Sequence, residues 1–268
     1  MKGAERVRKA IEEANRRGRA ALIPYLCAWD PDLATTEAAL WAVAEAGASV
    51  VELGFPFSDP LADGPTIQAA TQRALRHHPT LEAFLEFVSG LYERGYPLPI
   101  VVMGYYNPFF RFGISRFARE ARRAGLCGAI IPDLSLEEAR PWLREARRQG
   151  LASIMLAAPT TPTQRLEKLA RASSGFLYYV SVTGITGTRD RLPEDLALRL
   201  DLCREVSPVP VAVGFGISRP EQVQMLAPHA EAIVVGSALV KIMESEGRRA
   251  PTSLEKFVRK LVAATKRP

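Results

Sequence analysis

Two carboxylates account for the chemistry that this sequence suggests. Glu52 stands in "SVVELG", at the end of an apolar run of the kind that a parallel sheet buries on both faces. Burial disfavours the charged form of a carboxyl group and raises its pKa, so Glu52 is a candidate general acid and base, or else a member of a structural ion pair. Asp63, in "SDPLADGP", either caps a helix that opens at Pro65 or supplies a second acid.

The segment between these two acids is rich in residues that restrict or bend the backbone. They are Gly54, Pro56, Pro60, Gly64 and Pro65. We expect this stiff loop to bring Asp63 back over the strand end that carries Glu52, whereas Asp59 fits a turn residue. Two acids from one loop could divide the work, one transferring protons and the other stabilising a cation.

Two glycine turns suggest an anion site. "VGFGIS" (213–218) and "VGSALV" (235–240) each lead from a strand through glycine into the N-terminus of a helix, where backbone N–H groups and the helix dipole attract an anion. The alternative is that glycine only makes a tight turn. The pattern is not a dinucleotide fingerprint, because Arg219 occupies the place of the third glycine.

A third segment, "SVTGITGTRDRLP" (181–193), combines Gly184 and Gly187 with threonines and Arg189. Such a loop could fold over a site and exclude water, or it could be an ordinary surface loop.

Other classes of catalyst need histidine or lysine side chains that the expected strands do not provide. The histidines (His77, His78 and His229) fall in or beside helices rather than at strand ends, which argues against a metal-dependent aldolase or epimerase. No lysine falls in an expected strand, which argues against a Schiff-base aldolase. Carboxylate acid–base chemistry without a metal is what remains.

The elements that would position these residues alternate between strand and helix. We expect strands at Leu22–Leu26, Ser49–Leu53, Ile100–Met103, Gly128–Ile131, Ala152–Ala157, Phe176–Val180, Val209–Val213 and Ala232–Val235. We expect helices at Thr35–Ala46, Leu81–Arg94, Ser115–Ala124, Leu136–Gln149, Gln164–Arg171, Leu196–Glu205, Pro220–Leu226 and Ser253–Thr265. Eight such units predict an α/β protein with a closed (β/α)₈ TIM barrel.

Residues 1–268 are expected to form one barrel domain, in which an extra amphipathic helix within residues 1–18 caps the bottom of the barrel. The long loops 54–65 and 181–193 would then lie at the C-terminal face, where active sites of this fold are built.

The composition is consistent with such an enzyme. Hydrophobic residues make up 47% and charged residues 24% of the 268 residues, as in globular proteins with a sizeable core. The net charge of +6 is spread over helix-like stretches and no nucleic-acid motif accompanies it, so we expect no nucleic-acid partner. Three scattered cysteines indicate reduced thiols in a cytoplasm. The charged N-terminus and the absence of a long apolar run predict neither export nor a membrane span.

Four motifs together resemble the tryptophan synthase alpha subunit. They are "VELGFPFSDPLADGPTIQ" (51–68), "YYVSVTGITGTR" (178–189), "GFGIS" (214–218) and "VGSALVK" (235–241). They occur in the order of that family, whose barrel with an N-terminal helix covers essentially the whole chain; the first motif is highly specific and the last two are weak alone. The resemblance implies a lyase of tryptophan biosynthesis. It would cleave indole-3-glycerol phosphate to indole and glyceraldehyde 3-phosphate by a retro-aldol step, without a metal or organic cofactor.

The resemblance also implies roles for individual residues. Glu52 would protonate the indole ring at C3 and accept the glycerol hydroxyl proton, while Asp63 would bind the indole N–H and stabilise the positive charge that develops there. The implied phosphate contacts are Gly187, Gly216, Gly236 and Ser237. The other implied substrate contacts are Tyr105, Thr186, Phe215 and Tyr178, of which Thr186 would orient Asp63. Tyr178 could instead only fill the barrel core.

The family's alpha subunit forms an α₂β₂ complex with a beta subunit, which carries pyridoxal phosphate and receives indole through a tunnel. By resemblance, the loop 54–62 and "GYYNP" (104–108) would face that partner. "CAWDP" (27–31) departs from the family's usual "TAGDP" or "TLGDP", with Cys27 and Trp29 in place of threonine and glycine on the partner-facing side. Two alternatives stay open: a stand-alone lyase that releases free indole, and a catalytically silent barrel that acts as an allosteric or binding partner.

Overall fold

The computed structural model describes residues 1–181 and 195–267. The strands are β1 (Ala21–Cys27), β2 (Val51–Gly54), β3 (Ile100–Met103), β4 (Gly128–Ile130), β5 (Ala152–Ile154), β6 (Leu156–Ala157), β7 (Leu177–Val180), β8 (Val211–Gly214) and β9 (Ala232–Val235). The helices are α1 (Gly3–Arg16), α2 (Leu33–Glu45), α3 (Pro65–Leu75), α4 (Leu81–Glu93), α5 (Tyr106–Phe112), α6 (Ile114–Arg123), α7 (Arg140–Gln149), α8 (Thr163–Ala172), α9 (Leu196–Val206), α10 (Pro220–Leu226), α11 (Ser237–Glu246) and α12 (Ala250–Ala264), with a 3₁₀ turn at Gly247–Arg249.

The strands form one parallel sheet that is closed into a barrel. Their order is β5-β4-β3-β2-β1-β9-β8-β7-β6, and neighbouring strands pair in parallel. The sheet begins with β5 and ends with β6, which are consecutive in the chain and are separated only by Met155. The predicted strand 152–157 therefore pairs with β4 through its first half and with β7 through its second half. The predicted eight-stranded TIM barrel is confirmed, with its fifth strand divided in two.

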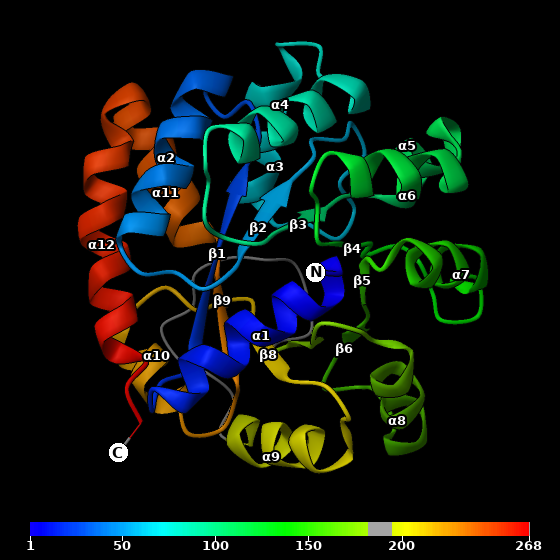
Figure 1. Ribbon diagram of the computed structural model, residues 1–268. Coiled ribbons are helices and arrows are strands. Elements are labelled where there is room, and N and C mark those ends of the chain that lie inside the picture. The colour runs from blue at the N-terminus through cyan, green and yellow to red at the C-terminus, as the bar shows by residue number, and fades with distance from the viewer. Residues whose placement is uncertain (182–194, 268) are drawn as a thin grey trace.

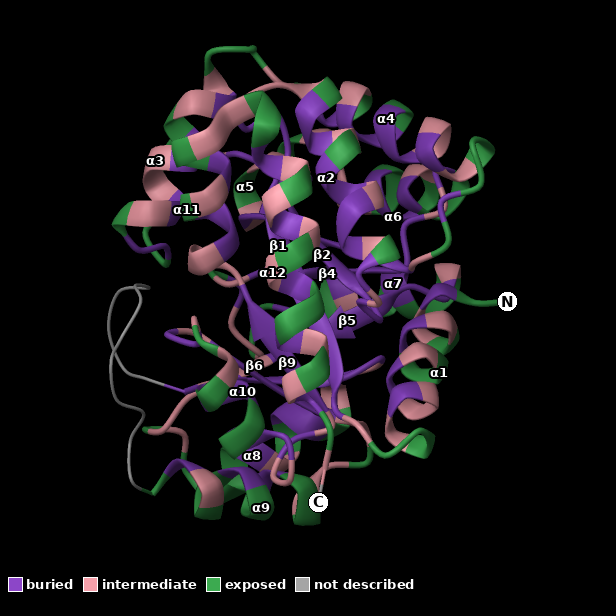
Figure 2. Ribbon diagram, turned by 90° about the vertical axis from the view of Figure 1, so that its left-hand side faces the viewer, coloured by how far each residue is buried: buried purple, intermediate pink, exposed green. Residues whose placement is uncertain are grey.

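Side chains that point into the barrel alternate with side chains that face the helices. A buried cluster contains Ile23 from β1, Val101 from β3 and Ala212 from β8, and the helix α1 contributes Val7 and Ile11 to the same cluster. A parallel barrel is filled by layers of side chains. The amphipathic helix α1 lies across one end of the barrel and completes the lowest layer of this core (Figures 1 and 2). The predicted extra N-terminal helix is thus confirmed.

The other helices surround the strands, with their buried faces toward the sheet and their exposed faces outward (Figures 1 and 2). Local capping sets boundaries of α2, α4 and α7. The Asp32 side chain accepts a hydrogen bond from the Thr35 N–H at 2.7 Å and begins α2. Thr80 begins α4 in the same way, and Gly150, in the left-handed conformation with φ of 71°, ends α7.

Four helices depart from the sequence prediction. The helix α3 was implied only as a helix that opens at Pro65, and it has 11 residues. The helix α5 was not predicted, because the Tyr106 N–H at its start is capped by Asp133 Oδ1 at 2.8 Å, a residue far along the chain. The helix predicted to start at Leu136 begins only at Arg140, where Pro141 occupies the first turn, a position that proline favours. The helix α11 was implied only as the end of a glycine turn, and it is a full helix of 10 residues.

None of the helices within the described part of the chain has the length and apolar character needed to cross a lipid bilayer.

Candidate active site

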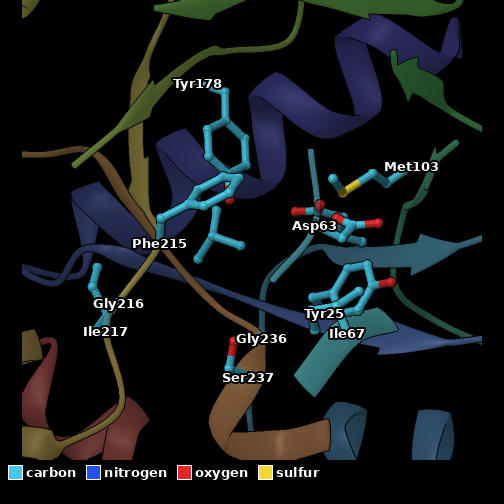
Figure 3. Close-up of a pocket in the computed structure, with 12 residues that line it drawn as sticks. Tyr25, Asp63, Ile67, Met103, Tyr178, Phe215, Gly216, Ile217, Gly236 and Ser237 are labelled. Carbon is cyan, nitrogen blue, oxygen red and sulfur yellow. The ribbon is translucent and has the colours of Figure 1, made fainter. Parts of the chain in front are cut away.

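The inward-facing rows of several strands end in one cavity. Tyr25 (β1) is paired in register with Glu52 (β2), so their side chains leave the sheet on the same face. Met103, Tyr178 and Val234 continue the inward rows of β3, β7 and β9 to the same rim. The cavity encloses about 440 Å³ including solvent at its mouth, and Asp63, Ile67, Phe215, Gly216, Ile217, Gly236 and Ser237 complete its lining (Figure 3). The cavity lies at the carboxyl ends of the strands, where barrel enzymes bind substrates.

Glu52 is the most buried acid of this cavity. Only 1% of the residue is exposed, and its Oε2 atom has no hydrogen-bond partner among the described residues. Burial in this apolar setting, with a smaller contribution from the negative charge of Asp63, raises the pKa of Glu52 from 4.5 to about 8. At neutral pH the side chain is therefore mostly protonated and can donate a proton.

Asp63 stands in the same cavity but in a more polar setting. Burial raises its pKa from 3.8 to about 6, while a hydrogen bond from the Tyr105 hydroxyl lowers it. The same hydroxyl accepts a hydrogen bond from the Ala62 N–H at 2.9 Å, which fixes the acid loop just before Asp63. The Asp63 N–H in turn donates to the Pro60 carbonyl at 3.0 Å. At neutral pH Asp63 is mostly ionised, so one acid is protonated while its neighbour carries charge.

The two glycine turns of the anion hypothesis both reach the cavity, but they differ. At the start of α11, Gly236 and Ser237 line the cavity, and the first N–H groups of a helix have no acceptor within the helix. At the start of α10, the N–H groups of Ser218 and Arg219 already donate to the Gln222 side chain at 2.8 and 3.1 Å. An anion would therefore be held chiefly by the α11 turn.

The turn after β8 brings an aromatic side chain into the cavity. Phe215 has φ of 72°, in the left-handed region that few residues with a side chain adopt, and Gly216 follows with φ of 78°. The Ser181 hydroxyl donates to the Phe215 carbonyl and holds this backbone. The Phe215 ring packs edge-on against Tyr178, with ring centroids 5.7 Å apart, so the two form one aromatic wall (Figure 3).

Tyr25 is a cavity residue that the sequence did not single out. Its hydroxyl lies against Gly54, where a Cβ atom would collide with it, and Tyr178 uses Gly214 in the same way. Glycine at these strand ends makes room for an aromatic side chain from the neighbouring strand. The sequence did contain a signal for Tyr25: it is an aromatic residue in the strand before the one that carries Glu52, and that second strand ends in Gly54.

The remaining expected positions have different outcomes. Thr186 and Gly187 lie outside the described residues. Tyr105 is not among the residues that line the cavity, and it contacts Asp63 instead. Trp29 adopts a left-handed backbone with φ of 64°, and its buried ring packs against Phe84. Among the residues that the structure describes, no group of three or more histidine, cysteine or acidic side chains is arranged for a metal ion.

The closed parallel sheet, with a cavity at the carboxyl ends of its strands, is the architecture of a (β/α)₈-barrel enzyme. A sequence profile described as "Tryptophan synthase alpha chain" matches residues 11–266. The tryptophan synthase alpha chain of Geobacter sp. strain M21 is 48% identical over 89% of both chains, and that of Gluconacetobacter diazotrophicus is 45% identical over 96% of both.

Solved structures give the same result. Mycobacterium tuberculosis tryptophan synthase superposes with a TM-score of 0.89 at 36% identity, covering 98% of this chain and 99% of that one. An alpha-subunit variant from Pyrococcus furiosus superposes with a TM-score of 0.84 at 40% identity, covering 92% and 99%. The chain belongs to the tryptophan synthase alpha chain family.

Proposed function

We propose that this chain is the lyase that cleaves indole-3-glycerol phosphate to indole and glyceraldehyde 3-phosphate in cytoplasmic tryptophan biosynthesis. The observation that carries the proposal is the pair of buried acids, Glu52 and Asp63, in one cavity with the α11 turn. Family membership supports the substrate, and the cavity supports the assignment of residues.

The shifted pKa values divide the roles of the two acids. Glu52, protonated at neutral pH, gives its proton to C3 of the indole ring, and the positive charge that develops reaches the ring nitrogen. Asp63, ionised at neutral pH, accepts the indole N–H and stabilises that charge. The Glu52 carboxylate then takes the proton of the glycerol hydroxyl, the carbon–carbon bond breaks to form the aldehyde, and the bonding electrons restore the aromatic ring. Glu52 ends in its starting form, so no external acid or base is consumed.

The rest of the cavity fits the other parts of the substrate. The aromatic wall of Tyr178 and Phe215 offers a flat apolar surface for the indole ring. Gly216, Gly236 and Ser237 lie where backbone N–H groups and a hydroxyl can hold the phosphate. We assign the phosphate contact of Gly187 and the contacts of Thr186 and Tyr105 on the family resemblance. In this scheme every proton is moved by side chains of this chain and no cofactor takes part; pyridoxal phosphate belongs to the beta partner of the α₂β₂ complex.

The decisive experiment incubates the purified chain with indole-3-glycerol phosphate and follows indole release, alone and with a tryptophan synthase beta subunit. We expect release in both cases and a higher kcat with the beta subunit. Equal kcat values would support a stand-alone lyase. No release in either case, from a folded chain, would overturn the proposal in favour of a catalytically silent barrel.

Single substitutions test the residue assignment. Glu52→Gln and Asp63→Asn should each lower kcat by about 100-fold or more, because each removes a group that acts on the reacting atoms. The control is Glu145→Gln, which changes another buried glutamate, on α7 and outside the cavity. Activity retained in both cavity variants would refute the assignment.

A further inference from the structure

A three-residue ion cluster lies outside the cavity, and the proposed chemistry does not use it. Arg73 grips the Asp30 carboxylate with two nitrogens, at 2.7 and 3.0 Å, and its third nitrogen bonds Glu244 at 2.7 Å. This fork-to-carboxylate geometry fixes direction as well as distance, which a lysine cannot do.

The cluster joins the three segments that build one side of the cavity. Arg73 lies on α3, which begins at Pro65, two residues after Asp63. Glu244 lies on α11, which begins at Ser237 of the proposed phosphate turn. Asp30 follows β1, the strand that places Tyr25 in the cavity. The guanidinium therefore connects the helix behind the second acid to the helix behind the anion site.

The burial of these charges makes the connection strong at one end. The Asp30 side chain is 2% exposed and that of Arg73 is 22% exposed, whereas that of Glu244 is 49% exposed. Burial raises the pKa of Asp30, and the hydrogen bonds and charge of Arg73 oppose this effect. Removal of Arg73 would leave a buried carboxylate without its cation, so the turn that follows β1 would have to rearrange.

Further contacts hold the same turn from both sides. His77 Nε2, just after α3, lies 2.7 Å from the Pro31 carbonyl oxygen. Arg248, just after α11, donates to Asp32 at 3.1 Å. These contacts lie nearer the surface, and the Arg73 fork is the one that reaches both helices at once.

We propose that Arg73 is a positioning residue that sets the phosphate turn at the start of α11 relative to the acid loop before α3. The inference rests on the proposed function for its substrate. The phosphate is remote from the bond that breaks, so its contacts contribute nearly equally to the ground state and the transition state. Loss of Arg73 should therefore raise KM and weaken anion binding more than it lowers kcat.

The test compares Arg73→Gln and Arg73→Lys with the parent, using indole release from indole-3-glycerol phosphate and the Kd of glycerol 3-phosphate. For Arg73→Gln we expect KM and Kd to rise by about fivefold or more, with kcat changed by less than about threefold. Arg73→Lys should recover only part of this loss, because it keeps the charge but not the fork. Glu244→Gln removes the more exposed of the two ion pairs of Arg73 and should give a smaller rise in KM and Kd. This variant provides the test if the Arg73 variants do not fold.

The control is Arg204→Gln. Arg204 makes a similar pair with Glu231 at 2.6 Å, at the amino-terminal end of β9 and away from the cavity. A purely structural role would lower Tm in both arginine variants and leave KM and Kd unchanged below the transition. Unchanged KM and Kd in folded Arg73→Gln, or equal rises in the control, would overturn the inference. The binding of glycerol 3-phosphate separates this result from a failure of the proposed function, because it can be measured even if no indole is released.

Discussion

Replacement of Glu52 by glutamine is expected to remove a loss of stability that the parent chain suffers as the pH rises, while it removes most of the indole release. The folded chain holds a proton on Glu52 up to about pH 8, whereas an unfolded glutamate releases its proton near its ordinary pKa of 4.5. Between these values the unfolded chain binds fewer protons than the folded chain, so folding becomes less favourable as pH rises. The contribution of protonated Glu52 to the free energy of unfolding is fully present below about pH 4.5 and is lost as the pH rises through about 8.

The magnitude follows from the shift. At about 1.4 kcal/mol per pKa unit, the loss between about pH 5 and about pH 8 amounts to about 3 kcal/mol for Glu52 alone. Glutamine has nearly the shape of the protonated acid and does not titrate, so its variant lacks this loss. Asp63 is present in both chains, and its own titration largely cancels in the comparison.

The assay is urea unfolding of the parent and of Glu52→Gln, followed by circular dichroism across this pH range. The free energy of unfolding of the variant, minus that of the parent, should rise by about 3 kcal/mol from the acidic to the basic end. A difference that stays constant would mean that Glu52 titrates as an ordinary glutamate. Its role as the proton donor at neutral pH would then lose its physical basis.

Three further outcomes are expected from the same cavity. Asp63→Asn removes a charge that helps to raise the pKa of Glu52. In a plot of kcat against pH, the fall in the remaining activity on the basic side should therefore begin at a lower pH than in the parent. Tyr105→Phe removes the hydrogen bond that lowers the pKa of Asp63; the acidic limb of kcat/KM should move above pH 6, and an unmoved limb would contradict the contact. Ser237→Ala should raise KM for indole-3-glycerol phosphate by about tenfold with kcat nearly unchanged, and an equal fall in kcat would instead place Ser237 at the reacting atoms.

Much of this fold could be predicted because buried parallel strands are continuous apolar runs. Glu52 was identifiable for the same reason, since burying a carboxylate at the end of such a run costs free energy unless the group is paired or functional. The same continuity hides which side chains face inward, because both faces are apolar and no alternation marks them. Tyr25, Met103 and Val234 were therefore not predicted to line the cavity, although they continue the inward rows of their strands.

Other features were hidden because they depend on contacts between distant parts of the chain. The start of α5 is fixed by Asp133, 27 residues beyond Tyr106. The partners of Arg73 are 43 and 171 residues away from it. Likewise, the capping of the α10 amides by the Gln222 side chain could not be read from the glycine pattern, which made the two anion turns look equivalent.

The helix α1 closes the end of the barrel that lies opposite the cavity. Val7 and Ile11 fill the lower end of the barrel with packed side chains, so the described residues leave this end closed. Substrate must enter, and both products must depart, by way of the rim formed at the strand ends. A protein that docks over this rim would therefore affect both the entry of substrate and the release of products.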